Sequence, residues 1–223
     1  MTTRLIFIML ATIVLTNGKL LGQDTRSRNH EIGINLLQLP ATTLDLTYEL
    51  SGHPRYSMIF NAGYTINYSK SFDYLGFFLS PHYKCGNDGY SMKKQTGGFI
   101  KAGLKYNFRS TMEKPNYFFL GGFIAGSVVS ERAEYRNMEI QDSPVEALSH
   151  TVFIPGLTAA TGYHFKISNK LNSDVGVHIS FPSKNYRNLF GYSNYIPGMG
   201  YMETCANERI FPLLVWNLKY SLH

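Results

Sequence analysis

The feature that most constrains the fold is a pair of alternating segments within residues 151–182. In the first segment, apolar side chains occupy most odd positions from 153 to 167, and small or polar residues lie between them. A tight turn at residues 169–170 separates it from a second segment, 171–182, with the same alternation. Because successive side chains of a strand point to opposite faces, each segment predicts a strand with one apolar face. Two such strands joined by so short a turn predict a β-hairpin.

The same alternation recurs along the chain and predicts eight strands with no internal domain boundary. The expected strands cover residues 31–50, 56–68, 75–84, 100–109, 117–131, 151–167, 171–182 and 210–222. The first is ambiguous, because Pro40 interrupts it and it exceeds the ~9–11 residues of one membrane crossing. It is either one strand kinked at Pro40 that projects beyond the membrane, or a tight hairpin turning at 38–41. The unbroken alternation and the shortness of 31–38 favour the kinked strand.

The second face of the strands distinguishes a membrane barrel from a soluble sheet. A soluble β-protein carries charged side chains densely on its wet face, whereas here that face holds Gly, Ser, Asn, Thr and His. Charged residues make up 16% of the chain, below the usual ~25%, and aromatic residues recur near strand ends, as in membrane girdles. The predicted fold class is all-β: an eight-stranded antiparallel up-and-down transmembrane β-barrel. A soluble secreted β-domain, with the apolar face turned inward, is the alternative.

The N-terminal residues differ from the rest of the chain. Arg4 precedes an apolar run at residues 5–15 and a short polar tail. This pattern predicts that residues 1–22 are a cleaved signal peptide, too short to span a bilayer as a helix; a retained N-terminal anchor is the alternative. Residues 23–30 are expected to be a flexible segment, and residues 31–223 the barrel domain. The predicted location is the bacterial outer membrane.

Loop lengths predict how the barrel is oriented. The expected loops at 85–97, 132–150 and 183–209 fall on one rim, and the 169–170 turn falls on the other. Outer-membrane barrels keep short turns in the periplasm and long loops outside, so the long loops are expected outside. Cys85 and Cys205 therefore share a rim, where they form either a disulfide or two free thiols.

Two stretches resemble known outer-membrane barrels. The last strand carries Trp216, Leu218, Tyr220 and Leu222 in alternation. It resembles the terminal strand read by the outer-membrane assembly machinery, although it ends in Leu-His rather than an aromatic residue. The opening IGINLLQLPATTLDLTYEL, followed by YSMIFNAGYTINY, resembles the start of small outer-membrane β-barrel families of Gram-negative bacteria, including a domain family of unknown function. The resemblance implies outer-membrane lipids and the assembly machinery as partners, and it supplies no catalytic residues.

The polar faces of the strands supply the candidate site residues. The candidate lumen-lining residues are Asp45, Glu49, His82, Lys101, Lys105, His164, Asp174 and His178, and Arg109 and Lys166 share their faces. These groups either line a pore or, as we favour, neutralise one another inside a packed barrel. The three histidines have no ligand spacing, so we expect no metal and no cofactor.

The loops supply two further candidates. Tyr186, Tyr192, Tyr195 and Tyr201 form either a contact surface for an extracellular sugar or protein, or part of an aromatic girdle. Ser149 and His150, close to Asp142 and Glu146, suggest a hydrolase, but the sequence shows no supporting geometry.

Three functions are compatible with these patterns. We favour a non-enzymatic outer-membrane barrel with a packed polar lumen and a structural or surface-interaction role. A narrow channel or carrier for small solutes is the alternative, and a membrane-embedded lipid-modifying enzyme is the third. The net charge of +6 is modest, and the sequence contains no nucleic-acid-binding patch and no phosphate-binding glycine loop.

Overall fold

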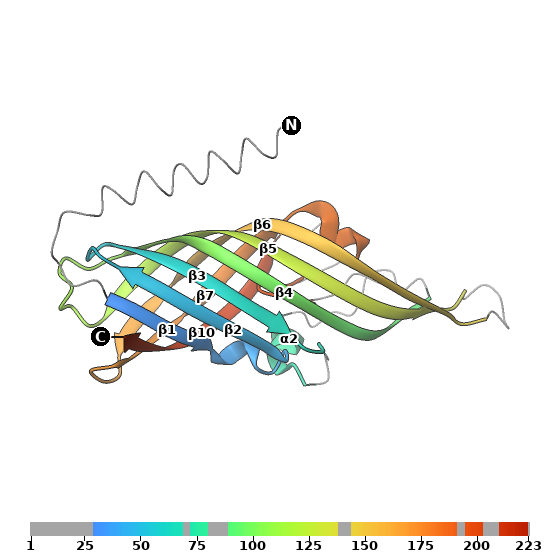
Figure 1. The fold of residues 1–223 in the computed structure, drawn as a ribbon, viewed down its shortest axis with the longest axis horizontal. Helices are drawn as coiled ribbons and strands as arrows, with labels where there is room; N and C mark the ends of the chain where they lie inside the picture. The colour runs from blue at the N-terminus through green and yellow to red at the C-terminus, as the bar shows by residue number, and fades with distance from the viewer. Residues whose placement is uncertain are drawn as a thin grey trace, which may run out of the picture.

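The computed structural model describes residues 29–68, 72–79, 89–137, 144–190, 195–202 and 210–222. These residues form a closed barrel of eight antiparallel strands (Figure 1). The strands are β1 (Asn29–Asn35), β2 (Thr43–Ser51), β3 (Tyr56–Thr65), β4 (Tyr90–Asn107), β5 (Tyr117–Tyr135), β6 (Glu146–Lys166), β7 (Leu171–Pro182) and β10 (Phe211–Leu222). Each pairs with its neighbour in the barrel order, and β1 pairs with β10 to close the ring. The predicted fold class, an eight-stranded antiparallel barrel, is confirmed.

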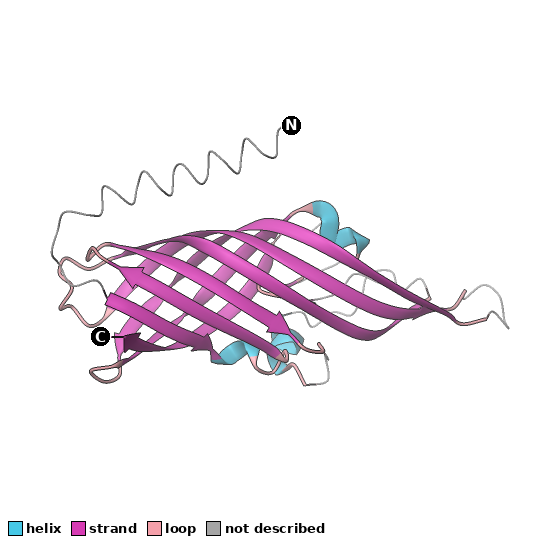
Figure 2. Cartoon of the chain, in the orientation of Figure 1, coloured by secondary structure: helices cyan, strands magenta, loops and turns pink. Residues whose placement is uncertain are grey.

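Shorter elements connect the strands. They are η1 (Leu36–Gln38), α2 (Tyr74–Leu79), η2 (Lys184–Asn188) and a small hairpin of β8 (Tyr195–Ile196) and β9 (Gly200–Tyr201). The helical pieces lie toward the end of the barrel opposite the N-terminus of β1 and the C-terminus (Figure 2). None of the described helices has both the length and the apolar character needed to cross a bilayer.

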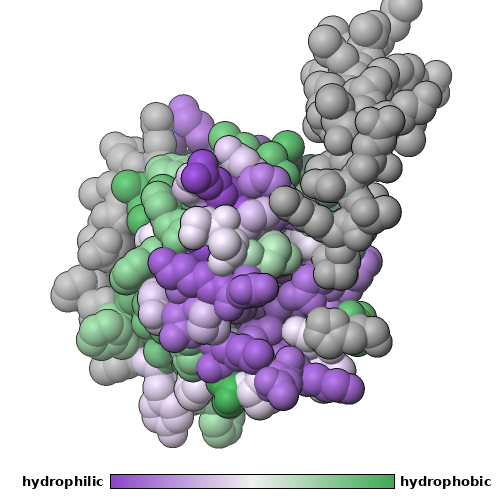
Figure 3. All heavy atoms as spheres, turned by 90° about the vertical axis from the view of Figure 1, so that its left-hand side faces the viewer, coloured by the Kyte–Doolittle hydropathy of each residue, from purple (hydrophilic) through white to green (hydrophobic). Residues whose placement is uncertain are grey.

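The strands turn most of their apolar side chains outward and most of their polar side chains inward. On β4, Ile100 and Leu104 are 69% and 61% exposed, whereas Lys101 and Lys105 are 2% and 1% exposed. A soluble β-barrel has the opposite arrangement, and a membrane barrel has this one. Seen from the end that holds the short turns, a largely hydrophilic end face borders hydrophobic side chains (Figure 3).

The prediction of one kinked strand at residues 31–50 is wrong, and the hairpin alternative is correct. β1 and β2 pair with each other, and η1 and a turn connect them. The side chain of Asn35 accepts a hydrogen bond from the Leu37 backbone at 3.2 Å and starts η1, while Thr42 adopts a positive φ of 51°. Even-numbered residues face outward on both β1 and β2. The alternation in the sequence therefore continues without a break through the turn that connects them. Phase alone therefore cannot detect this turn.

The strand expected at residues 75–84 is also wrong. Residues 74–79 form α2, and residues 80–88 lie outside the described part of the chain. Asp73 causes the helical turn, because its carboxylate accepts the backbone N–H of Gly76 at 2.9 Å, as a helix N-cap does. A short apolar run does not distinguish a strand from a helix. The total of eight strands holds because the extra strand of the first hairpin replaces this one.

Three neighbouring strands are much longer than the rest. β4, β5 and β6 contain 18, 19 and 21 residues, whereas the other five barrel strands contain 7 to 12. A membrane crossing takes about 9–11 residues, so β4–β6 extend beyond the barrel as a projecting wall (Figure 1). Much of the sequence expected to be loop at 85–97 and 132–150 belongs to this wall.

Connecting segments cover the outer edges of the projecting wall. On β6, pairing with β7 ends at Gly156, and beyond it the Ser183 backbone N–H donates to the Pro155 carbonyl at 2.7 Å. The Asn185 amide donates to the Phe153 carbonyl at 3.0 Å. On β4, the Tyr68 backbone donates to the carbonyl of Gln95 at 2.8 Å. These contacts satisfy edge groups that could otherwise pair with another chain.

Candidate functional site

The candidate site is the interior of the barrel, and its strongest feature is a cluster of four charged side chains. Lys105 donates to Glu49 at 3.0 Å and to Asp174 at 2.9 Å, and Lys219 donates to the same two carboxylates. The four side chains are at most 4% exposed. They come from four different strands, and each occupies an inward position on its strand. Two cations and two anions compensate one another, as buried charges require.

Neighbouring side chains extend this cluster toward the short turns. His164 Nδ1 lies 2.5 Å from Asp174 Oδ1, and the Tyr117 ring stacks on His164 with a centroid distance of 4.5 Å. The Arg109 guanidinium lies 4.4 Å from the centroid of Tyr117 and donates to the Pro54 carbonyl at 2.7 Å. The interior is thereby filled down to the turn between β2 and β3.

A weaker polar layer lies farther from the short turns. Lys101 Nζ is 3.5 Å from His178 Nδ1, and the Asn35 amide donates to Asp45 at 3.1 Å. In the described part of the chain, no ion pair within 4.0 Å joins Lys101 to Asp45. A cavity of about 10 Å³ lies between this layer and the charged cluster and touches Asn61. That volume holds about one water molecule.

The mouth of the barrel, which is the end opposite the short turns, is filled by the β8–β9 hairpin. The Tyr195 hydroxyl donates to Gln38 and lies 2.8 Å from Thr43 Oγ1, while the Tyr201 hydroxyl donates to Asp73 at 2.7 Å. Both tyrosines are fully buried. Burial is the main cause that raises the pKa of both phenols above the ordinary value. We call residues 195–202 the tyrosine plug.

Glycine allows the tyrosine plug to turn inside the barrel mouth. Gly198 and Gly200 have φ values of +73° and +116°, which side chains rarely adopt. A Cβ atom on Gly198 would also collide with the ring of Phe99. Ile196 and Met199 of the plug belong to an apolar cluster with Val129 and Ile154 of the projecting wall.

The structure brings most of the predicted lumen residues together. Seven of the eight lie inside the barrel and are at most 6% exposed: Asp45, Glu49, Lys101, Lys105, His164, Asp174 and His178. His82 lies outside the described residues, as do Cys85 and Cys205 and therefore their possible disulfide. Arg109 is buried as expected, whereas Lys166 is exposed beside a short turn.

The loop tyrosines differ from the expected contact surface. Tyr186, Tyr195 and Tyr201 are at most 4% exposed, so they are packing residues of the barrel mouth rather than a surface open to partners. Tyr192 lies outside the described residues. Loop composition did not reveal this, because inward folding of a loop depends on contacts with distant strands.

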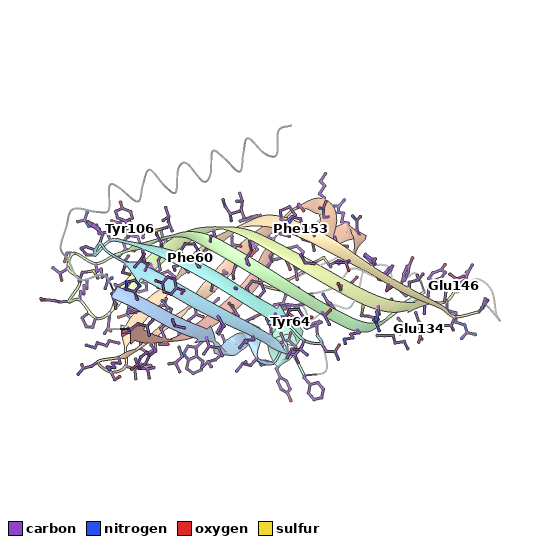
Figure 4. All side chains as sticks on the ribbon, viewed as in Figure 1. Phe60, Tyr64, Tyr106, Glu134, Glu146 and Phe153 are labelled. Carbon is purple, nitrogen blue, oxygen red and sulfur yellow. The ribbon has the colours of Figure 1, made fainter. Side chains whose placement is uncertain are left out.

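The described hydrolase candidates do not share one face of their strand. Ser149 and His150 are successive residues of β6, so their side chains point to opposite faces. The His150 ring packs on Phe190 with a centroid distance of 3.9 Å, and Glu146 is exposed near the tip of the projecting wall (Figure 4). Asp142 lies outside the described residues. Within the described ranges, no group of three potential metal ligands occurs.

Several residues that complete the interior were not among the predicted site residues. Lys219 joins both carboxylates of the charged cluster, and Gln38, Asp73 and Gln95 hold the tyrosine plug. A signal for Lys219 was present, since it occupies an inward position in the alternation of the last strand. The residues that hold the plug have no such periodic signal.

The architecture is similar to that of a solved outer-membrane protein. No protein-family model and no curated protein matches the sequence. A major outer membrane protein from Thermus thermophilus matches in structure with a TM-score of 0.50 and 8% identity, covering 87% of this chain and 98% of that chain. Neisserial surface protein A matches with a TM-score of 0.38 and 10% identity, covering 87% and 93%. At such identities the likeness concerns the fold alone. The chain therefore has the fold of an outer-membrane β-barrel.

Proposed function

We propose that this chain is exported, loses its signal peptide, and resides in the outer membrane as a barrel with a closed interior. Its role is structural or concerns interactions at the cell surface, and it is neither a channel nor an enzyme. The observation that carries this proposal is the filled lumen. The charged cluster closes one half of the barrel, and the tyrosine plug closes the other.

The outer surface supports the membrane location. Outward-facing aromatic residues gather toward the short turns, where Tyr56 packs on Tyr106 at 5.3 Å and Phe118 packs on Tyr163 at 4.8 Å between ring centroids. Farther along, Phe153 is 57% exposed (Figure 4). Apolar side chains lie between these aromatic levels. This is the pattern of an apolar band flanked by aromatic girdles.

The arrangement of the interior argues against the channel alternative. An ion could pass only if Lys105 and Lys219 separated from Glu49 and Asp174. Removing one partner of a buried ion pair costs about 3–5 kcal/mol. Passage would also require the tyrosine plug to leave the barrel mouth, which would break its hydrogen bonds to Gln38 and Asp73.

The proposal is tested by single-channel recording in planar bilayers. We expect the folded protein to give no discrete openings, with folding verified by a heat-dependent shift in gel migration. A porin recorded in the same bilayers serves as the positive control. Discrete openings that disappear in a Lys101→Gln variant would contradict the closed interior and favour the channel. Appearance of the untagged protein in the soluble fraction would contradict the membrane location.

A further inference from the structure

We infer that Lys94 and Arg132, on the outer face of the projecting wall, form a binding site for the phosphate group of an outer-leaflet lipid. The inference rests on the proposed location in the outer membrane. It concerns the outside of the wall and is independent of the barrel interior.

The two cations are direct neighbours across adjacent strands. Lys94 of β4 pairs with Arg132 of β5 in the strand register, directly after a register shift between Met92 and Lys94. Opposed residues of an antiparallel pair point to the same face and have Cβ atoms about 4.5–5.5 Å apart. Arg132 shares its face with the exposed Val128, while its neighbours Glu131 and Ala133 are buried. Both cationic side chains are therefore directed outward, and both are exposed.

Like charges in this position are relieved by an anion. Directly opposed cations destabilise a sheet. Glu134, two residues after Arg132 on the same strand, pairs with Lys93 at 2.8 Å. Across the described ranges, no ion pair links a carboxylate to Lys94 or to Arg132. An ammonium and a guanidinium side by side on one face are a suitable pair of donors for a phosphate.

The height of the pair matches the lipid headgroups. A strand rises about 3.3 Å per residue, which becomes about 2.5 Å along the barrel axis at a tilt of about 40°. Tyr163 and Phe153 are ten residues apart on β6, so these aromatic levels are separated by about 25 Å, the height of an outer-membrane apolar band. Ser149, the register partner of Arg132, lies four residues beyond Phe153, about 10 Å higher by the same rise.

The surface between the apolar band and the cations is also suited to a lipid. The register places Thr96 beside Ser130 and Ser130 beside Thr151, one level below the cations. Ser130 and Thr151 hydroxyls lie 2.7 Å apart. Below them Val128 and Phe153, also register partners, are exposed. From the apolar band outward, the wall thus offers contacts for acyl chains, hydroxyl groups and then two cations, which is the order of groups in a phosphorylated lipid.

The test measures lipid binding to the full mature protein in detergent by native mass spectrometry. The probes are lipid A with two phosphates, lipid A without phosphate, and inorganic phosphate. We expect the bisphosphorylated form to bind at least about tenfold more tightly than the form without phosphate, because charge-assisted hydrogen bonds are lost with the phosphates. Equal binding of the two lipids by the unsubstituted protein would overturn the inference without any variant.

A pair of matched variants locates the site. The double variant Lys94→Gln, Arg132→Gln should lose this preference, with Kd for the bisphosphorylated lipid raised at least about tenfold. The control is Lys114→Gln, Lys166→Gln, which removes two exposed cations at the opposite end and should leave Kd unchanged. Equal losses in both variants would indicate general charge attraction and overturn the site. Inorganic phosphate that competes at the same concentration as the lipid would overturn the lipid as ligand.

The outcome also separates this inference from the proposed function. If the double variant folds, fractionates with the outer membrane and keeps the lipid preference, only the site is rejected. If the unsubstituted protein is found in the soluble fraction, the proposed location is rejected and the lipid site with it.

Discussion

The two halves of the barrel are closed in different ways. Near the short turns, side chains of the strands themselves fill the interior through the cluster of Glu49, Lys105, Asp174 and Lys219. Near the wide mouth, the strands leave space that the tyrosine plug fills from a connecting segment. Strand alternation specifies the first half. The second half depends on a connecting segment whose position is fixed by contacts with distant parts of the barrel. Substitutions should therefore affect the two halves to different degrees.

The largest effect is expected from breaking the charged cluster. Glu49→Gln removes a carboxylate shared by two buried lysines, leaving excess positive charge in the interior. We expect a loss of about 3–5 kcal/mol in the free energy of unfolding, the usual cost of removing one buried partner. Urea unfolding in detergent micelles measures it, with Glu113→Gln at an exposed turn position as the control. A loss equal to that of the control would mean that the cluster does not stabilise the near half.

A somewhat smaller effect is expected on the lipid-facing surface. Val177 lies on the outer face of β7, between the inward-facing Asp174 and His178 levels, and pairs with Leu214 and Thr161. Val177→Arg should reduce stability by up to roughly 2–4 kcal/mol, the cost of an arginine at the bilayer midplane. Folding yield and the heat-dependent gel shift measure the effect, with Val177→Leu as the control. Unchanged yield for the arginine variant would contradict the outward assignment of this face.

A more local effect is expected in the tyrosine plug. Tyr195→Phe removes a hydroxyl that contacts both Gln38 and Thr43, leaving buried polar groups without that partner. Such a loss costs about 1–3 kcal/mol. Hydrogen exchange should increase in residues 195–202 and in η1, while β1 and β10 near the charged cluster stay protected. Tyr64→Phe, at an exposed position, is the control. Equal acceleration in both halves would show that they open together.

The smallest effect is expected on the projecting wall. Lys93→Gln removes an ion pair with Glu134 whose two side chains are 51% and 43% exposed. Exposed pairs contribute about 0–1 kcal/mol, so stability should change little. Thermal unfolding at low and high salt measures this, since screening weakens such pairs. A change as large as that of Glu49→Gln would indicate that the wall supports the barrel more strongly than its exposure suggests.

The same contrast explains what the sequence could predict. Alternation placed Glu49, Lys105 and Asp174 inside, because a strand position has only two possible directions. It could not show the turn after Asn35, because the connection preserves the phase. Nor could it show that Asp73 starts a helix, or that Tyr195 and Tyr201 fold inward, since both depend on partners far away in the chain. The alternation predicts that Lys219 faces inward. Its ion pairs, however, depend on β10 lying beside β7.

The pairing of β1 with β10 has a consequence for biogenesis. The seam joins the two ends of the barrel domain, and the Asn35 side chain accepts the Trp216 backbone N–H at 3.1 Å across it. β10 also delivers Lys219, the fourth charge of the cluster. Until this strand arrives, β1 and β7 have open edges and the two carboxylates lack one of their cations. The pairing of β10 therefore both closes the ring and brings a second cation to Glu49 and Asp174.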